Sequence, residues 1–176
     1  MSEHTAESAD GAARPGVSQA IHATALVVGE AGVIIRGSSG AGKSSLAIAL
    51  LALARDRRLF AQLIGDDRLF VHTKAGKILA RGAPRVRGLI ERRGYGIVEA
   101  ATEPGAIIRL IVDLLAQSER TARLPDDDVL KTSLGGVALP RLVFGAESNV
   151  FERAYAVLGY LDNIGDRIMT AFAHFT

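Results

Sequence analysis

Short apolar runs alternate with polar, glycine-containing breaks along the first third of the chain. Residues 23–29 (ATALVVG) and 32–37 (GVIIRG) are apolar runs bounded by glycines, a pattern that predicts two strands joined as a hairpin. Residues 44–58 are apolar nearly all round until Arg55, which predicts a buried helix rather than a surface one. Strands that alternate with helices favour a sheet with helices packed on it, so the predicted fold class is α/β.

The middle of the chain continues the alternation. Residues 59–67 form an apolar run that ends abruptly in two acids, which predicts a further strand. Residues 68–72 and 78–82 predict a hairpin closed by the turn between them. Residues 83–100 are dense in arginine and glycine, and we expect a loop around a short helix there.

The two ends of the chain differ in character. Residues 1–17 are small, polar and acidic, and because such a composition cannot repay its ordering entropy, we expect a disordered tail. Residues 106–115 predict another strand, and residues 148–175 predict a long C-terminal helix with a break near Gly165. No repeat or linker divides the remainder, so we expect one domain over residues 18–176.

Composition narrows the class of protein. The chain has 176 residues, 48% of them hydrophobic and 23% charged, as in a globular domain with its own core. A net charge of +2 is too small to favour nucleic acid as a partner. Cysteine is absent, which excludes disulfides and cysteine-ligated metals, and no apolar run reaches the ~20 residues that span a bilayer. The N-terminus has no apolar signal core, so we expect a cytoplasmic, soluble protein.

A glycine-rich turn lies between the second predicted strand and the predicted helix. It carries the pattern G-x-x-x-x-G-K-[ST] as Gly37, Gly42, Lys43 and Ser44, in the strand-to-helix context that a phosphate-binding loop requires. Its backbone N–H groups and the helix N-terminus would attract phosphates. Lys43 would reach the β and γ phosphates of ATP, and the Ser44 hydroxyl would bind Mg²⁺. The predicted nucleotide-binding residues are Gly37, Ser38, Ser39, Gly40, Ala41, Gly42, Lys43, Ser44 and Ser45.

This motif does not name a reaction, because GTPases, ATPases and kinases share it, and a flexible serine-glycine loop is its structural alternative. The chain has no N-K-x-D motif for guanine, and TSLGGVA resembles the L-S-G-G-Q segment of transporter ATPases only in composition. An acid facing the metal is expected after a core strand, either from the pair Asp66 and Asp67 or from Asp113. We favour the pair, because one acid can lie near the metal while the other accepts a proton, although Gly-Asp-Asp also favours a plain turn.

The order of segments resembles the HPr kinase/phosphorylase family, especially its bacterial catalytic domain. The matching segments are AIHATALVV, GSSGAGKSS, GDD, GAP and LIERRGYGIVEA, and the resemblance extends over about residues 20–175. Its most specific mark is an E-x-R-G-x-G-I segment, met by Glu91, Arg93, Gly94, Gly96 and Ile97, of which the first four make up the signature loop. The resemblance implies a P-loop kinase domain of the HPr kinase / phosphoenolpyruvate carboxykinase type, with a mixed central sheet and flanking helices.

The resemblance also implies an activity. Family members use ATP and Mg²⁺ to phosphorylate a serine of HPr, the small phosphocarrier of the sugar phosphotransferase system. Many also run the reverse reaction, in which inorganic phosphate removes that group and pyrophosphate forms. Members assemble as hexamers, so a homo-oligomer is expected here.

Roles carry over by position. Lys43 would bind and polarise the phosphates, and Ser44 and Glu91 would hold the metal with Asp66 beside them. Asp67, backed by Asp66, would take the serine proton.

Two more catalytic assignments depend on the resemblance alone. His22 matches the histidine before the first core strand, although a lone histidine is more often a packed or capping residue. Arg123 in RTARLP matches the family's catalytic arginine by a loose alignment. Glu91 has a structural alternative too, a surface salt bridge with Arg92 or Arg87.

The chain departs from the family pattern at several places. Typical members have an additional N-terminal domain, where this chain has a short acidic tail. Ala23 replaces the glycine after the histidine, and Ser45 replaces an acid after the loop. The family's basic V-K-x-G-R-N segment, associated with the reverse reaction, reads VFGAESN here and keeps only Asn149. Kinase activity is therefore favoured over phosphorylase activity. An ATP-binding regulatory module without turnover and a P-loop small-metabolite kinase are the alternatives.

Overall fold

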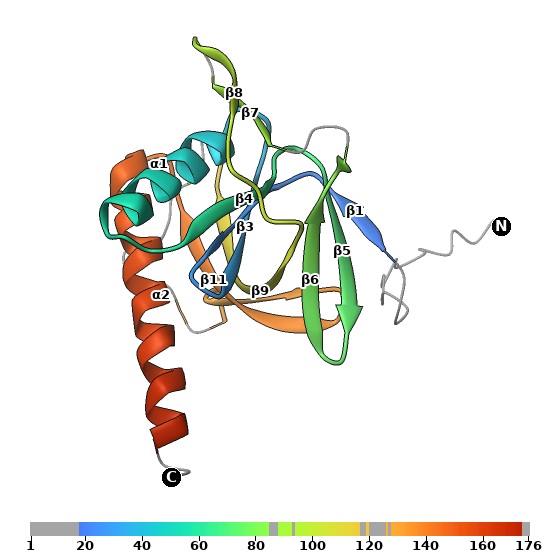
Figure 1. Ribbon diagram of the computed structural model, residues 1–176, viewed down its shortest axis with the longest axis vertical. Helices are drawn as coiled ribbons and strands as arrows, with labels where there is room; N and C mark the ends of the chain where they lie inside the picture. Colours follow the sequence, from blue (N-terminus) through green and yellow to red (C-terminus); the bar gives the residue numbers. More distant parts are fainter. Residues whose placement is uncertain are drawn as a thin grey trace, which may run out of the picture.

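The computed structural model describes residues 18–84, 88–92, 94–116, 119, 126 and 128–173, with the backbone alone for Arg92 and residues 165–173. The described part is built on one large mixed sheet with two helices against one face (Figure 1). The strands run in the order β1-β5-β6-β9-β3-β2-β4, and β11 pairs with β9 and carries β10. The bounds are β1 (Gln19–Ile21), β2 (Thr24–Val28), β3 (Ala31–Gly37), α1 (Lys43–Asp56), β4 (Ala61–Gly65), β5 (Leu69–Lys74), β6 (Lys77–Gly82), β7 (Leu89–Arg92), β8 (Gly96–Glu99), β9 (Ala106–Leu114), β10 (Lys131–Leu134), β11 (Val137–Phe144) and α2 (Val150–Ala173).

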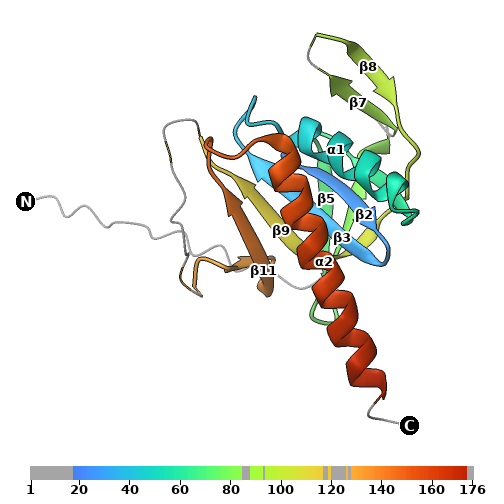
Figure 2. The same cartoon turned by 90° about the vertical axis from the view of Figure 1, so that its left-hand side faces the viewer.

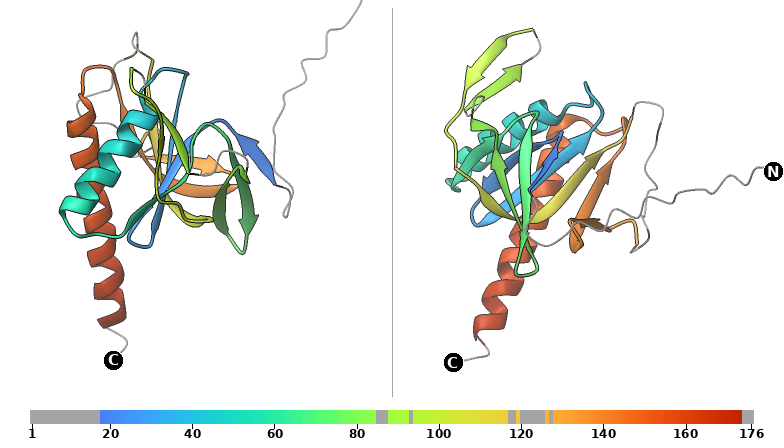
Figure 3. Two further views of the ribbon diagram at one scale, coloured as in Figure 1. Left: turned by 45° about the horizontal axis from the view of Figure 1, so that its top comes forward. Right: turned by 90° about the vertical axis from the view of Figure 1, so that its right-hand side faces the viewer.

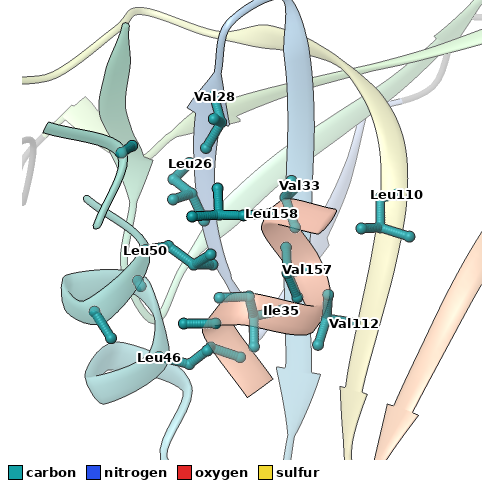
Figure 4. Close-up of a cluster of buried hydrophobic side chains, with 14 of the residues drawn as sticks. Leu26, Val28, Val33, Ile35, Leu46, Leu50, Leu110, Val112, Val157 and Leu158 are labelled. Atoms are coloured by element: carbon teal, nitrogen blue, oxygen red, sulfur yellow. The ribbon is translucent and has the colours of Figure 1, made fainter. Parts of the chain in front are cut away.

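The hydrophobic core between the sheet and the helices explains why the first strands read as continuous apolar runs. Every residue of β2 is buried, with Leu26 and Val28 in the cluster that faces α1 and α2. Figure 4 shows these side chains meeting Leu50 from α1 and Leu158 from α2. Ala25 and the other alternate residues face a second core on the opposite side of the sheet. A strand buried on both faces needs apolar residues at every position.

The second core lies where the sheet bends away from the helices. Strands β5 and β6 turn out of the plane of β2 and β3 (Figure 3), and side chains such as Val71 and Ile78 pack against Ile34 and Ile111. Gly82 at the end of β6 makes the close approach to β4, because a Cβ there would lie 2.1 Å from the backbone oxygen of Ile64. The bend therefore brings the end of β6 beside the end of β4.

Most of the predicted elements are present, and the α/β fold class is confirmed. The predicted strand pairs form the hairpins β2-β3 and β5-β6, and the other predicted strands are β4 and β9. Helices α1 and α2 occupy the two predicted helical segments. Within the described part of the chain, neither helix is long and apolar enough to cross a membrane. Residues 1–17, predicted to be a tail, lie outside the described residues.

Two expectations about secondary structure are wrong, and two strands were not expected. Residues 89–92 and 96–99 form the two-stranded sheet β7-β8 where a loop was expected, and this hairpin stands apart from the main sheet (Figure 2). Strands β10 and β11 were not expected, although Gly135 and Gly136 supply the two positive φ angles of their turn. The helical backbone of α2 continues past residue 165, so no break occurs there, and a helix tolerates an internal glycine at a cost of about 1 kcal/mol.

Candidate active site

Three chain segments meet at one edge of the main sheet. Strand β2 pairs antiparallel with both β3 and β4, so β3 and β4 point the same way and end on either side of the start of β2. The phosphate loop follows β3, Asp66 and Asp67 follow β4, and His22 and Thr24 stand at the start of β2. Ligands in α/β proteins bind outside the carboxyl ends of strands arranged in this way. The fold therefore gathers four of the five predicted catalytic residues, Lys43, Asp66, Asp67 and His22, from three separate segments.

A bulge in β4 sets the direction of the first aspartate. Ala25 of β2 pairs with Gly65, and the register shifts between this pair and the next, which leaves Ile64 as an extra residue. One position beyond the Ala25–Gly65 pair, Asp66 comes opposite Thr24. A one-residue change of register would move every side chain beyond it to the other face, and bulges commonly serve to aim a side chain next to an active site.

The phosphate loop runs without a break from Gly37 to Ser45, with residues 38–40 exposed. Gly42 precedes α1 with a φ of 97°, in the left-handed region that glycine adopts readily, and no side chain caps the first turn of the helix. The N–H groups at a helix start have no partner within the helix. An uncapped start next to a glycine-rich loop is therefore suited to an anion.

Lys43 is buried, with its ammonium group over the loop that precedes it. Its Nζ atom donates to the backbone oxygens of Gly37 and Ser38, both at 3.1 Å, and lies 3.3 Å from Nε2 of His22. A buried ammonium group is costly unless its donors have acceptors, and these oxygens supply them. The cation is thus held at the mouth of the loop, beside the histidine predicted from the start of β2.

Asp66 is buried and accepts hydrogen bonds from two hydroxyls. Thr24 Oγ1 donates to Oδ1 at 2.5 Å, and Ser44 Oγ lies 2.9 Å from Oδ2 and 3.1 Å from Oδ1. The residues described include no cluster of three or more histidine or acidic side chains suited to hold a metal ion. However, one carboxylate next to one hydroxyl fits Mg²⁺, which typically takes one or two protein ligands and completes its shell with waters and phosphates.

Asp67 has a different environment from its neighbour. Its φ is 64°, a left-handed conformation that aspartate tolerates better than most residues, and its side chain is 65% exposed. Its Oδ1 atom lies 3.8 Å from Nε2 of His22, whose side chain is 56% exposed. Consecutive residues therefore place one carboxylate in the protein beside Ser44 and the other in solvent beside His22.

A cleft of about 1200 Å³ opens beside the two aspartates. The β7-β8 hairpin forms one of its walls, and most of its lining is apolar. Glu91 lines the cleft with Asp66 and Asp67, but among the described residues no hydrogen bond or ion pair joins it to Ser44 or Asp66. Gly94 also lines it. The lining residues are Asp66, Asp67, Arg68, Phe70, Ala83, Pro84, Leu89, Ile90, Glu91, Gly94, Tyr95, Gly96 and Ile97.

Two predicted site residues lie outside the described part of the chain. These are Arg93 of the signature loop and Arg123, the predicted catalytic arginine. The two glycines of the same signature, Gly94 and Gly96, have φ angles of 75° and 109° at the tip of the β7-β8 hairpin. Their conformation accounts for the glycines in the signature, while both arginines stay predictions.

Asp113, the other acid considered for the metal, is held by two arginines. Arg36 donates to its two oxygens at 2.6 and 2.7 Å, and Arg141 Nε donates to Oδ2 at 2.6 Å. Burial raises the pKa of Asp113, but the hydrogen bonds and charges of Arg36 and Arg141 outweigh it, so the pKa lies below its usual value. This carboxylate ties together the ends of β3, β9 and β11.

Sequence reasoning missed Thr24 as a member of the site. Threonine is common in strands, and nothing in the local pattern distinguishes Thr24 from the apolar residues that follow it. The register of β2 against β4, including the bulge, brings it to Asp66. Thr24 could have been identified as a site residue only by knowing that two strands about 40 residues apart in sequence pair with each other.

Comparison with known proteins places the chain near one family. Residues 16–144 match the family described as HPr Serine kinase C-terminal domain. The HPr kinase/phosphorylase of Mycoplasma mycoides is 31% identical over 150 residues, which cover 77% of this chain and 46% of that protein. The HPr kinase/phosphorylase of Neisseria meningitidis is 30% identical over 135 residues, covering 68% of this chain and 40% of that protein. The chain thus spans less than half the length of these relatives.

A solved structure shares the fold. The HPr(Ser) kinase/phosphatase from Coxiella burnetii superposes with a TM-score of 0.65 at 22% identity, covering 84% of this chain and 99% of that one. This match confirms the P-loop kinase fold with its mixed sheet that the sequence resemblance implied.

Proposed function

This chain belongs to the HPr serine kinase C-terminal domain family, and we propose that it is an ATP- and Mg²⁺-dependent kinase that phosphorylates a serine of the phosphocarrier protein HPr. The observation that carries the proposal is the meeting of the phosphate loop with Asp66 and Asp67 at one edge of the sheet. Phosphoryl transfer needs charge neutralisation and in-line positioning more than covalent chemistry, and this edge offers groups for both.

The phosphate loop and Lys43 would bind the nucleotide. The N–H groups at the start of α1 and the ammonium of Lys43 would contact the phosphates, and Ser44 and Asp66 would hold Mg²⁺. When bound, Mg²⁺ supplies positive charge that neutralises the transferring phosphoryl group. In this structure the Lys43 ammonium donates to two loop oxygens and lies beside His22. With a nucleotide bound, it would donate to phosphate oxygens instead.

Asp67 would act as the general base. Its side chain is exposed on the cleft side, where an acceptor hydroxyl can approach it. As the serine oxygen attacks the γ phosphorus, the bond from that phosphorus to the bridging oxygen of ADP breaks, and the hydroxyl proton passes to the carboxylate of Asp67. His22, 3.8 Å away, would orient Asp67 and share its charge.

The cleft beside Asp67 supports a protein acceptor over a small metabolite. It is large, and apolar side chains including Phe70, Leu89 and Ile97 line it. Ile97 is 70% exposed on a hairpin that projects from the body of the molecule (Figure 2). An exposed apolar surface of this kind can accept a chain segment with apolar side chains, whereas a pocket for a small molecule usually encloses most of its ligand.

Further parts of the proposal rest on the family alone. They are the reverse phosphorolysis reaction, a homo-oligomer such as a hexamer, a cytoplasmic location and a place in the regulation of the sugar phosphotransferase system. Segment 143–149 carries no cation where the family has a basic sequence, which favours the kinase direction. Glu91 as a metal ligand belongs to this group as well.

Transfer of label from γ-labelled ATP to purified HPr tests the function. The wild-type chain should label HPr, and HPr with its acceptor serine changed to alanine should stay unlabelled. Asp67→Asn should lower kcat by about 10²- to 10⁴-fold, the usual contribution of a general base, while nucleotide affinity stays unchanged. Asp56→Asn, the same change at the far end of α1, is the matched control and should keep full activity.

Two results would change the proposal in different ways. Full activity of Asp67→Asn would remove Asp67 as the base and leave the kinase function intact. ATP binding by the wild-type chain with no labelling of HPr would instead favour the ATP-binding regulatory module. Running the assay on phosphorylated HPr with inorganic phosphate tests the reverse reaction, which should be weak or absent.

A further inference from the structure

A polar side chain is fully enclosed in the otherwise apolar strand β2. Thr24 has no solvent exposure, and the four residues that follow it in the strand are alanine, leucine and valine. Its hydroxyl donates to Oδ1 of Asp66 at 2.5 Å. Because burying a hydroxyl costs free energy unless it is hydrogen-bonded, this bond is what makes threonine acceptable at the position.

The bond also fixes the carboxylate that it meets. The last torsion of an aspartate side chain is soft, so the carboxylate plane is set by its partners. Thr24 holds Oδ1 from the strand side, and Ser44 lies nearer to Oδ2 from the start of α1. With Oδ1 anchored on β2, Oδ2 stays directed to the phosphate-loop serine.

We propose that Thr24 is a positioning residue for the metal: its hydroxyl holds the Asp66 carboxylate in the orientation in which Asp66 and Ser44 bind Mg²⁺ together. The inference rests on the proposed nucleotide-binding function and assigns to Thr24 a part in metal binding that the signature motifs do not contain. Partners that orient a metal ligand typically change metal affinity by about 10- to 100-fold when they are lost.

A packing role and a positioning role make different demands on the residue at position 24. Packing requires a side chain of the right volume, so valine, which has nearly the shape of threonine, would serve best. Positioning requires a hydroxyl donor, so serine would serve despite the missing methyl group. Size and donor capacity can therefore be separated by three substitutions at this one site.

The test measures how strongly metal increases nucleotide affinity. Binding of the non-hydrolysable analogue AMPPNP is titrated by calorimetry, once with Mg²⁺ and once with EDTA, for the wild type, Thr24→Ser, Thr24→Val and Thr24→Ala. We expect Thr24→Ser to keep the wild-type ratio of the two affinities. Thr24→Val and Thr24→Ala should both lower it by about tenfold and leave the affinity in EDTA unchanged.

A control on the same strand separates positioning from stability. Val27 is buried on β2 and contacts the second core, so Val27→Ala should lower the melting temperature while keeping the metal ratio. Electron paramagnetic resonance of Mn²⁺ with AMPPNP provides a second readout, in which Thr24→Val should show more free Mn²⁺ than Thr24→Ser.

The outcomes separate this inference from the proposed function. If the ratio of the two affinities followed side-chain size, with Thr24→Val close to the wild type and Thr24→Ser lower, the positioning role would be overturned. The proposed function would stand, because the wild type would still bind metal and nucleotide. Absence of AMPPNP binding by the wild type itself would overturn both proposals. A fall in the metal ratio of Val27→Ala equal to that of Thr24→Val would also overturn the positioning role.

Discussion

Asp66 and Asp113 lie at the same edge of one sheet, yet their partners are of opposite kinds. Asp66 follows β4 and accepts from two hydroxyls, those of Thr24 and Ser44. Asp113 stands near the end of β9 and accepts from two guanidinium groups, which hold both of its oxygens. Strands β4 and β9 both run parallel to β3, so each carboxylate emerges near the phosphate loop.

The partners decide what each carboxylate can do. A hydroxyl orients a carboxylate without cancelling its charge, so Asp66 keeps the negative charge that a divalent cation needs. Two arginines more than neutralise Asp113, and a metal ion would have to displace them. Position at the end of a core strand is therefore insufficient to identify a metal ligand; the charge of the neighbours distinguishes a carboxylate suited to metal from one that ties strands together.

Replacing Asp66 should have the largest effect, a loss of HPr phosphorylation. Asp66→Asn removes the charge that would hold Mg²⁺, and because metal stabilisation of phosphoryl transfer is worth several kcal/mol, we expect HPr phosphorylation to fall by about 100-fold or more. The measurement is the rate of label transfer at saturating ATP over a range of Mg²⁺ concentrations. Asp113→Asn is the matched control and should keep activity within a few-fold of the wild type. Similar losses of HPr phosphorylation in Asp66→Asn and Asp113→Asn would contradict the view that only Asp66 is suited to bind the metal.

Replacing Asp113 should instead lower the stability of the folded protein. Asp113→Asn loses charge-assisted hydrogen bonds to Arg36 and Arg141, and a hydrogen bond to a charged group contributes about 1.5–3 kcal/mol, so we expect the free energy of unfolding to fall by about 2 kcal/mol. Urea denaturation measures this change.

An exposed ion pair provides the control for that measurement. Asp162 pairs with Arg57 at 3.3 Å, but its side chain is 56% exposed, so Asp162→Asn should cost less than about 1 kcal/mol. Equal costs for the two aspartates would show that the arginine cluster at Asp113 adds nothing beyond a surface pair.

The local parts of the site could be read from the sequence, and the parts made by strand pairing could not. The loop from Gly37 to Ser45 is a contiguous pattern, and its strand-to-helix context is visible in the flanking apolar runs. The sequence favoured the pair Asp66 and Asp67 over Asp113, but it could not show what Asp113 binds, because the arginines that hold Asp113 come from β3 and β11. Thr24 went unnoticed for the same reason, since its partner lies 42 positions away.

The errors in the fold have local causes. In β7, Ile90 is buried while its neighbours Leu89 and Glu91 are exposed, but the many arginines nearby hide this alternation in the sequence. Strands β10 and β11, which were also not predicted, flank Gly135 and Gly136, whose φ angles are both positive. Paired glycines between two short apolar runs are a hairpin signal that could have been used.

The smallest predicted effect is a dependence of the unfolding free energy on pH in acid, which Asp113 causes and which Asp113→Asn should lack. The pKa of Asp113 in the folded protein lies below its ordinary value of 3.8, because hydrogen bonds and charges from two arginines outweigh the effect of burial. The unfolded chain then binds more protons than the folded one between the two pKa values, so this contribution to stability is complete above pH 3.8 and is lost as the pH falls through the folded pKa. The difference in unfolding free energy between the wild type and Asp113→Asn should therefore shrink on acidification from about pH 6 to about pH 3, by at most about 1.4 kcal/mol per pH unit. Urea denaturation of both proteins at each pH measures it, and a difference that stays constant down to pH 3 would mean that the two arginines do not set the charge of this carboxylate.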